Sequence, residues 1–122
     1  MKTFTQLKIN DRKMYLNYGK KAVSFSNIKY IESIAGNYSM IRLLDKGSIC
    51  SAFTLKHYYS QLDTDHDFIL VRKGLLVNLK YAKEVFVEGG IRSLKMSTGE
   101  VFKLSRRQGP KVEECLKNAE MT

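Results

Sequence analysis

The sequence predicts one mainly β domain over residues 1–122, with a short helix near the middle of the chain and a second helix at its C-terminal end. Three observations support this prediction. Short runs rich in β-branched and aromatic residues recur along the chain, turn-forming residues separate them, and the hydrophobic period becomes helical in only two places. A chain of 122 residues is long enough for one compact core.

The expected strands are short apolar or alternating runs bounded by turn-forming residues. They cover residues 4–9, 14–18, 22–25, 28–34, 38–44, 48–53, 68–71, 84–88, 91–96 and 101–104. Two connections predict hairpins. Gly89-Gly90 is the stronger signal. Asp45-Lys46-Gly47 supplies a short loop in which we expect Gly47 to take a strained backbone conformation.

Residues 54–62 and the C-terminal segment have helical periodicity. In the first segment Thr54 can cap the helix, and one face is apolar, formed by Leu55, Tyr58, Tyr59 and Leu62. We expect the second helix to begin at Pro110, because a proline inside a helix costs ~3 kcal/mol or more, whereas the first helical position tolerates it. Residues 105–109 are then an exposed loop or a single turn.

The charge balance favours a polyanionic partner. Twenty-one Lys and Arg residues against twelve Asp and Glu residues give a formal net charge of +9. Residues 1–61 carry ten basic and three acidic side chains, and residues 62–122 carry eleven and nine. So large a basic excess in a small domain favours nucleic acid first and an anionic membrane surface second.

Several classes of function lack the residues they need. No apolar run reaches the ~20 residues of a membrane span, and the first residues lack the apolar core of a signal peptide. Cys50 and Cys115 lie far apart without ligand spacing, so we expect no disulfide, no metal, no cofactor and a reducing cytoplasm. His57 and His66 are expected at the surface, and the Asp63–Asp67 loop lacks the residues of a calcium loop. No catalytic motif is present, so an enzyme is the least favoured class.

Arg106-Arg107, preceded by Ser105, is the most informative polar cluster. The arginine fork can bind guanine O6 and N7 or clamp a phosphate, and a serine hydroxyl can bind a second phosphate oxygen. The alternative is a solvated pair at the entrance to a helix. Residue type alone favours neither interpretation.

Two further loops carry polar groups between apolar strands. In Arg72-Lys73-Gly74 the glycine permits close backbone approach while both cations can reach outward, although such a loop is more often plain surface. Asn37-Tyr38-Ser39 offers an amide, a phenol and a hydroxyl, although asparagine is common in turns because it tolerates left-handed φ.

Four segments in register resemble the LytTR-type DNA-binding domain. Residues 28–41, IKYIESIAGNYSMI, resemble its opening signature, and Thr54-Leu55-Lys56 with Leu62 resembles its helix. Residues 68–78, FILVRKGLLVN, resemble its central segment, and Gly99-Glu100 through residues 104–107, LSRR, resembles its closing motif. The resemblance covers about residues 3 to 118. Each motif alone is weak, and four in the same order are specific.

The resemblance implies an elongated fold of small antiparallel sheets and a role in bacterial transcription regulation. Family members commonly follow a receiver domain within response regulators, and no receiver domain is expected within these 122 residues. They bind double-stranded DNA in pairs on imperfect direct repeats, and their loops enter successive major grooves. A homodimer on DNA and a receiver domain in a longer parent chain are therefore expected partners.

The resemblance also assigns contact residues. It implies DNA contacts by the three loops already singled out, with the residues Asn37, Tyr38, Ser39, Arg72, Lys73, Gly74, Ser105, Arg106 and Arg107. Arg106 is the best candidate for direct base readout. Lys73 replaces the Ser or Asn common in the family, so its loop is expected to hold phosphate. Asn78 matches a family asparagine that we expect to bind backbone in a bend.

The function expected from these residues is sequence-specific DNA binding without chemistry. A rival from another class is a protein-interaction module that uses the same fold to sequester a partner regulator. Single-stranded RNA binding is a second rival, which requires aromatic residues exposed on a strand face. Tyr30, Tyr38 and Tyr58 are the candidates, and two of them lie in apolar patterns expected in the core.

Overall fold

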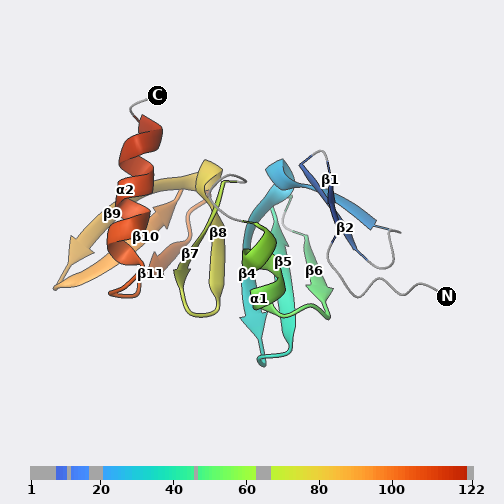
Figure 1. Ribbon diagram of the computed structural model, residues 1–122. Coiled ribbons are helices and arrows are strands. Elements are labelled where there is room, and N and C mark those ends of the chain that lie inside the picture. Colours follow the sequence, from blue (N-terminus) through green and yellow to red (C-terminus); the bar gives the residue numbers. More distant parts are fainter. Residues whose placement is uncertain (1–7, 11, 17–20, 46, 63–66, 121–122) are drawn as a thin grey trace.

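Three antiparallel sheets lie in a row and give the domain an elongated shape (Figure 1). The computed structural model describes residues 8–10, 12–16, 21–45, 47–62 and 67–120. One helix packs on the central sheet, and the other packs between the central and C-terminal sheets. This arrangement confirms the predicted mainly β fold with a mid-chain and a C-terminal helix.

The N-terminal sheet has the order β1-β2-β3, and the central sheet has the order β6-β5-β4-β8-β7. The N-terminal strands are β1 (Lys8–Asn10), β2 (Lys13–Leu16) and β3 (Lys21–Ser24). A 3-10 turn over Phe25–Asn27 leads into the central sheet. Its strands are β4 (Ile28–Ile34), β5 (Tyr38–Leu43), β6 (Ser48–Ser51), β7 (Phe68–Arg72) and β8 (Leu75–Asn78).

The C-terminal sheet has the order β11-β10-β9 and follows a second 3-10 turn over Leu79–Tyr81. Its strands are β9 (Ala82–Glu88), β10 (Ile91–Met96) and β11 (Val101–Lys103). The helices are α1 (Leu55–Gln61) and α2 (Gly109–Glu120). No helix in the described part of the chain is both long and apolar enough to cross a membrane.

Most predicted elements are found within one or two residues of their expected bounds. The helix expected from Pro110 begins at Gly109. Gly89 and Gly90 both have positive φ, as the predicted hairpin requires. Gly47 does not have positive φ, so the strained conformation expected there is wrong. The Gly47 N–H instead donates a hydrogen bond to Asp45 Oδ1 at 2.9 Å, which closes a turn through the aspartate side chain.

Some expectations fall on residues outside the described part of the chain. These are residues 4–7 of the first strand, residues 17–18 of the second, Lys46, and the Asp63, Asp65 and His66 part of the acidic loop. Thr54 is the N-cap of α1, but its hydroxyl lies 3.0 Å from His57 Nδ1 rather than bonding a backbone N–H. On the predicted apolar face of α1, Tyr59 is exposed while the other three side chains are buried.

Two hydrophobic clusters lie on opposite faces of β7 and β8. Phe68 and Leu76 belong to the cluster under α1, whereas Ile69 and Val77 belong to the cluster shared with the C-terminal sheet and α2. All four residues of β8 are buried. No strand was predicted over residues 75–78, because burial on both faces removes the alternation that indicates a strand.

An ion pair ties the central sheet to the C-terminal sheet. Lys29 Nζ of β4 lies 2.8 Å from Glu100 Oε2, and both side chains are mostly buried. Near them the rings of Tyr30 and Phe102 meet edge to face at 5.0 Å. Burial alone would raise the pKa of Glu100, but hydrogen bonds from the Lys29 ammonium and the Thr98 hydroxyl outweigh it and lower that pKa below its usual 4.5.

Glu100 should therefore make the domain less stable in acid. A carboxyl whose pKa is lower in the folded state stabilises the fold above its unfolded pKa, and this contribution disappears as pH falls through the folded pKa. We expect the urea midpoint to fall as the pH is lowered from neutral through 4.5 and below. In Glu100→Gln this part of the pH dependence should be absent, and an unchanged pH profile would contradict the ion pair's role.

Candidate nucleic-acid interface

Three loops that are far apart in the sequence meet at one edge of the domain. They are the β4–β5 turn, the β7–β8 turn and the β11–α2 connection, which all lie at the lower edge in Figure 1. Backbone hydrogen bonds join them: Ser33 N donates to Gly74 O at 2.9 Å, and Ser105 N donates to Val71 O at 3.1 Å. The first bond links the β7–β8 turn to β4 and the second links β7 to the start of the β11–α2 connection, so the three loops are held near one another.

The β4–β5 turn exposes an amide and a phenol. Ala35 and Gly36 take the positive φ values of 53° and 79° that reverse the chain. Asn37 is not in the left-handed region, so the conformational explanation for an asparagine here is wrong. Its exposed side chain has no hydrogen bond to a described residue, and Tyr38 beside it is 49% exposed.

Ser39 does not belong to the exposed surface. Its side chain is fully buried, and its hydroxyl donates to the Phe53 carbonyl at 2.8 Å. The structure therefore does not present the Ser39 side chain on this surface, and its contact with DNA remains a prediction. Along β5 the buried positions alternate, and Ser39 falls in phase with Ile41 and Leu43 rather than with the exposed Tyr38.

The β7–β8 turn presents one free cation and one anchored cation. Lys73 is exposed and has no ion pair with a described residue. Arg72 is half-buried, and its Nη1 donates to the Lys103 carbonyl at 3.3 Å while its guanidinium lies 5.9 Å from the Phe102 ring centroid. Gly74 has a φ of 87°, which an L side chain adopts only with strain.

The β11–α2 connection is a single tight turn, one of the two forms expected. Ser105 organises it: its Oγ accepts from Gln108 N at 3.1 Å, and its carbonyl accepts from Gly109 N at 2.8 Å. The serine hydroxyl thus supports the turn. Arg106 and Arg107 project from it, and both are exposed without an ion pair to a described residue.

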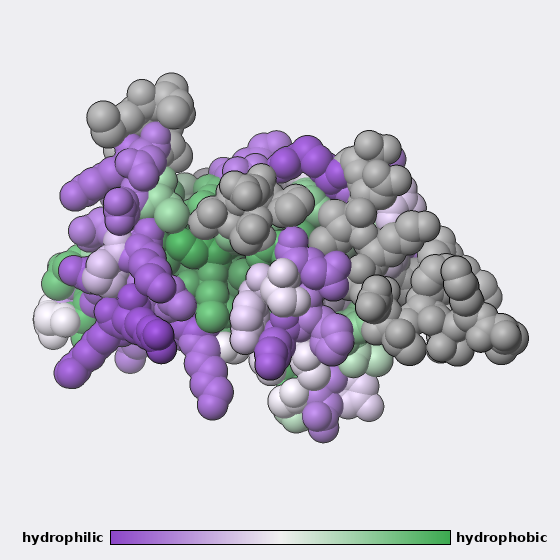
Figure 2. All heavy atoms as spheres, in the orientation of Figure 1, coloured by the Kyte–Doolittle hydropathy of each residue, from purple (hydrophilic) through white to green (hydrophobic). Residues whose placement is uncertain are grey.

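The edge is therefore a surface of uncompensated cations beside exposed polar groups. Figure 2 shows hydrophilic side chains extending below the C-terminal sheet at this edge. The described carboxylates that form ion pairs do so with cations elsewhere, as in Lys29–Glu100 and Arg42–Glu32. Such a surface attracts a polyanion by its charge and leaves an amide, a phenol and two guanidinium groups free to bind it.

Sequence reasoning missed Lys103, which lies between the second and third loops. Its side chain is exposed, and its carbonyl holds Arg72 in place. The only signal for it was the alternation of the 101–104 run, which places Lys103 on the opposite face from Phe102. The contact itself depends on the pairing of two sheets and has no local signature.

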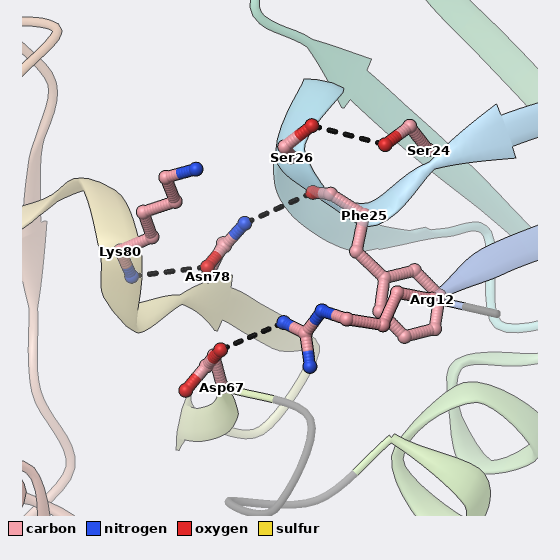
Figure 3. A pocket seen from close by; sticks show the side chains of 7 residues that line it. All are labelled: Arg12, Ser24, Phe25, Ser26, Asp67, Asn78 and Lys80. Carbon is pink, nitrogen blue, oxygen red and sulfur yellow. Dashed lines mark hydrogen bonds and ion pairs between the residues drawn. The ribbon is translucent and has the colours of Figure 1, made fainter.

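A polar pocket of about 260 Å³ lies at the opposite end of the central strands, away from the three loops (Figure 3). It is lined by Arg12, Ser24, Phe25, Ser26, Asp67, Asn78 and Lys80. Most of its polar groups bond one another: Arg12 Nη2 lies 2.8 Å from Asp67 Oδ2, and the two serine hydroxyls lie 2.9 Å apart. The pocket therefore lies where four segments of the chain meet.

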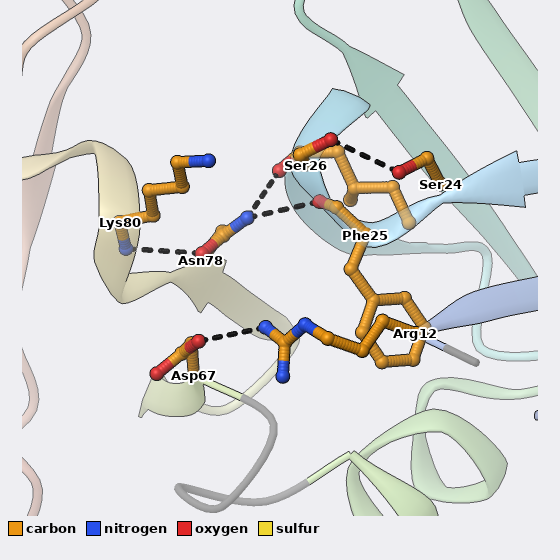
Figure 4. A network of polar contacts seen from close by, with 8 residues as sticks. Arg12, Ser24, Phe25, Ser26, Asp67, Asn78 and Lys80 are labelled. Carbon is orange, nitrogen blue, oxygen red and sulfur yellow. Dashed lines mark hydrogen bonds and ion pairs between the residues drawn. The ribbon is translucent and has the colours of Figure 1, made fainter. Parts of the chain in front are cut away.

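Asn78 forms the floor of that pocket, as Figure 4 shows. Its Nδ2 donates to the carbonyls of Phe25 at 3.1 Å and Ile28 at 2.8 Å, and its Oδ1 accepts from Lys80 N at 3.0 Å. The prediction that Asn78 binds backbone in a bend is confirmed. These three hydrogen bonds link the 3-10 turn over Phe25–Asn27 to the 3-10 turn over Leu79–Tyr81.

The described residues hold no group of three metal-ligating side chains. Cys50 is exposed and Cys115 is half-buried, and both are free thiols. Burial, followed by the nearby Glu114 carboxylate, raises the pKa of the Cys115 thiol.

Of the three tyrosines considered for base stacking, Tyr58 is fully buried and Tyr30 packs in the second cluster, so only Tyr38 is exposed.

Comparison with known proteins agrees with this fold. The LytTR DNA-binding domain family matches residues 19–117. A search of curated proteins gives no match. Among solved structures, the chain is similar to the LytTR DNA-binding domain of a protein described as a methyl-accepting/DNA response regulator from Bacillus cereus. The two share 18% sequence identity with a TM-score of 0.70, over 88% of this chain and 98% of that one. Because the family match covers most of the chain, this protein belongs to the LytTR family of DNA-binding domains.

Proposed function

We propose that this domain recognises a specific double-stranded DNA sequence through the three loops and so regulates transcription in a bacterium. The observation that carries the proposal is the joining of the loops by the Ser33–Gly74 and Val71–Ser105 backbone bonds. These bonds hold Lys73, Arg106 and Arg107 at one edge with no ion-pair partner among the described residues. Membership of the LytTR family supports DNA as the polyanion.

The loops divide the work of binding between affinity and specificity. Lys73 and Arg107 neutralise phosphates and release counterions, which makes the affinity strongly dependent on salt. Arg106 tests a base pair in the major groove with its planar fork, as arginine does at guanine O6 and N7. Asn37 and Tyr38 are the contacts of the first loop, and their uncharged groups can bind base edges as well as phosphates.

Arg72 and Ser105 stabilise the loops that carry the contact residues, rather than serving mainly as contacts themselves. Arg72 is anchored to the Lys103 carbonyl, and the Ser105 hydroxyl closes the turn that presents Arg106. The three loops reach successive grooves of one duplex, and two domains bind the two halves of a direct repeat. In a longer parent chain a receiver domain would control this pairing.

The test is a titration of duplexes enriched from a random library, compared with scrambled duplexes at two salt concentrations. We expect an enriched direct repeat to bind at least ~10³-fold more tightly than the scrambled sequence. Weak binding that is blind to sequence and is lost at physiological salt would contradict the proposal. Stable capture of a partner regulator under those conditions would instead support the interaction-module alternative.

Lys73→Ala should weaken binding to all duplexes alike. A lysine that neutralises one phosphate contributes about one unit to the slope of log affinity against log salt and carries no sequence information. We therefore expect the slope to fall by about one unit on both enriched and scrambled duplexes. Lys83, an exposed lysine of β9 outside the three loops, is the matched control. A loss restricted to the enriched duplex would show that Lys73 reads bases.

A further inference from the structure

Arg92 of β10 carries a buried donor without a hydrogen-bond partner. Its Nε is buried and unbonded in the described part of the chain. The carboxylate that pairs with it, Glu113 Oε1 of α2, is 3.8 Å from Nε, which is too long for a hydrogen bond. Buried donors are rarely left unpaired in native structures, so this one requires an explanation.

The side chain of Arg92 is pressed against the start of α2. A Cβ added to Gly109 would lie 2.9 Å from Arg92 Cδ and 3.0 Å from Nη1, so the flexible end of the Arg92 side chain would have to shift to make room for it. Gly109 has no positive φ, so its backbone does not require glycine. The Arg92 side chain therefore occupies the space that a side chain at position 109 would need.

Arg92 is also joined directly to the third loop. Leu104 N donates to the Arg92 carbonyl at 2.9 Å, one residue before Ser105 and two before Arg106. The Arg92 side chain is 37% exposed, although its Nε is buried. A cation is disfavoured next to the positive end of a helix, and among the described residues Glu113 is the carboxylate that pairs with it.

We propose that Arg92 is a further DNA contact, outside the three loops, which binds a backbone phosphate beside Arg106 and Arg107. This inference rests on the proposed function and adds to it a residue outside the three loops. Glu113 holds the guanidinium at 3.8 Å in the free protein and competes with the phosphate for it. Because Gly109 has no side chain, the Arg92 side chain can pack beside the start of α2.

The first test measures affinity for a random-sequence duplex between about 50 and 200 mM NaCl, because a phosphate contact does not depend on sequence. Arg92→Gln should lower the salt slope by about 0.9 and the affinity at the lower salt about tenfold. Lys117→Gln removes the same charge from the last turn of α2 and should change both quantities much less. Arg92→Lys should keep most of the salt slope, because it keeps the charge.

Glu113→Gln separates a phosphate contact from a purely structural ion pair, because the two predict different results. If Glu113 competes with phosphate, removing its charge should raise the affinity for the random duplex by more than Glu114→Gln, its exposed neighbour on α2, does. If the pair only supports the fold, Glu113→Gln should lower the urea midpoint and match Glu114→Gln in DNA affinity. That second result would overturn the inference.

A double-mutant cycle tests whether the packing of Arg92 against Gly109 matters for DNA binding. Gly109→Ala should reduce the affinity for the random duplex by no more than Arg92→Ala does, because the added methyl group shifts the end of the arginine without removing its charge. In the Arg92→Ala background the same change should cause no further loss. Equal losses in both backgrounds would show that the added methyl group acts on binding independently of Arg92, and would overturn the inference that packing against Gly109 positions this arginine for phosphate.

The wild-type titration separates the two levels of the argument. If the wild-type domain binds the duplex with a steep salt dependence while Arg92→Gln behaves like Lys117→Gln, only the role of Arg92 is wrong. If the wild-type domain shows no salt-dependent binding, the proposed function fails and the role of Arg92 fails with it.

Discussion

Arg106→Ala should reduce the affinity for the selected operator by about 1–3 kcal/mol and leave the affinity for scrambled DNA nearly unchanged. Arg106 is exposed on a turn that the Ser105 bonds and the Val71 carbonyl hold in place. A guanidinium presented from a rigid turn loses little entropy on binding, and its fork discriminates guanine from the other bases. The measurement is a titration of the operator and of variants substituted at each base pair.

The expected loss should be confined to one base pair. In Arg106→Ala the wild-type operator and a variant at the contacted position should bind equally, while substitutions elsewhere should keep their full cost. Lys111, an exposed cation on the first turn of α2, provides a control whose replacement by alanine should affect all duplexes similarly. Equal losses on operator and scrambled DNA for Arg106→Ala would mean that Arg106 binds phosphate only.

Asn78→Ala should cause the largest loss of stability expected from one polar residue in this domain. The Asn78 side chain is 2% exposed and makes three hydrogen bonds to backbone groups. Alanine would leave the carbonyls of Phe25 and Ile28 without this donor and the N–H of Lys80 without its acceptor. Since an unsatisfied buried group costs about 1–3 kcal/mol, we expect a loss of about 3 kcal/mol or more in the free energy of unfolding.

Urea denaturation followed by circular dichroism measures this loss. Lys80→Ala removes the exposed neighbouring side chain but keeps its backbone N–H, so it should change the free energy of unfolding by less than about 0.5 kcal/mol. Asn78→Asp keeps the acceptor for Lys80 N but places a carboxylate against two carbonyls, and it should be at least as destabilising as alanine. A loss in Asn78→Ala no larger than in Lys80→Ala would contradict the structural role.

The elements that sequence reasoning placed correctly are those whose signals are local. The Gly89-Gly90 hairpin depends on two residues that tolerate positive φ, and both have it. The start of α2 depends on Pro110, which fits only near the first helical position. The short strand β8 was missed because Leu75, Leu76 and Val77 are buried between two clusters. Neither face of that strand is polar, so no alternation marks it.

The candidate site was predicted as three loops, and the structure changes the role of individual residues in them. Asn37, Tyr38, Lys73, Arg106 and Arg107 are exposed as a contact surface requires. Ser39 is buried and Ser105 organises a turn, because a hydroxyl in a tight connection is often used by a nearby backbone group. Residue type identifies a group that can bind, and it does not show whether the fold already uses that group.

By itself, the sequence determined the class of fold, the family, the basic character of the domain and the loops that carry polar groups. Each of these depends on composition, on periodicity or on motifs in a given order along the chain. Only the tertiary structure decided that the loops share one edge, because the bonds from Ser33 to Gly74 and from Ser105 to Val71 link segments dozens of residues apart. The packing of the Arg92 side chain against Gly109 was also decided by the tertiary structure, because β10 and α2 come together only when the helix packs on the C-terminal sheet.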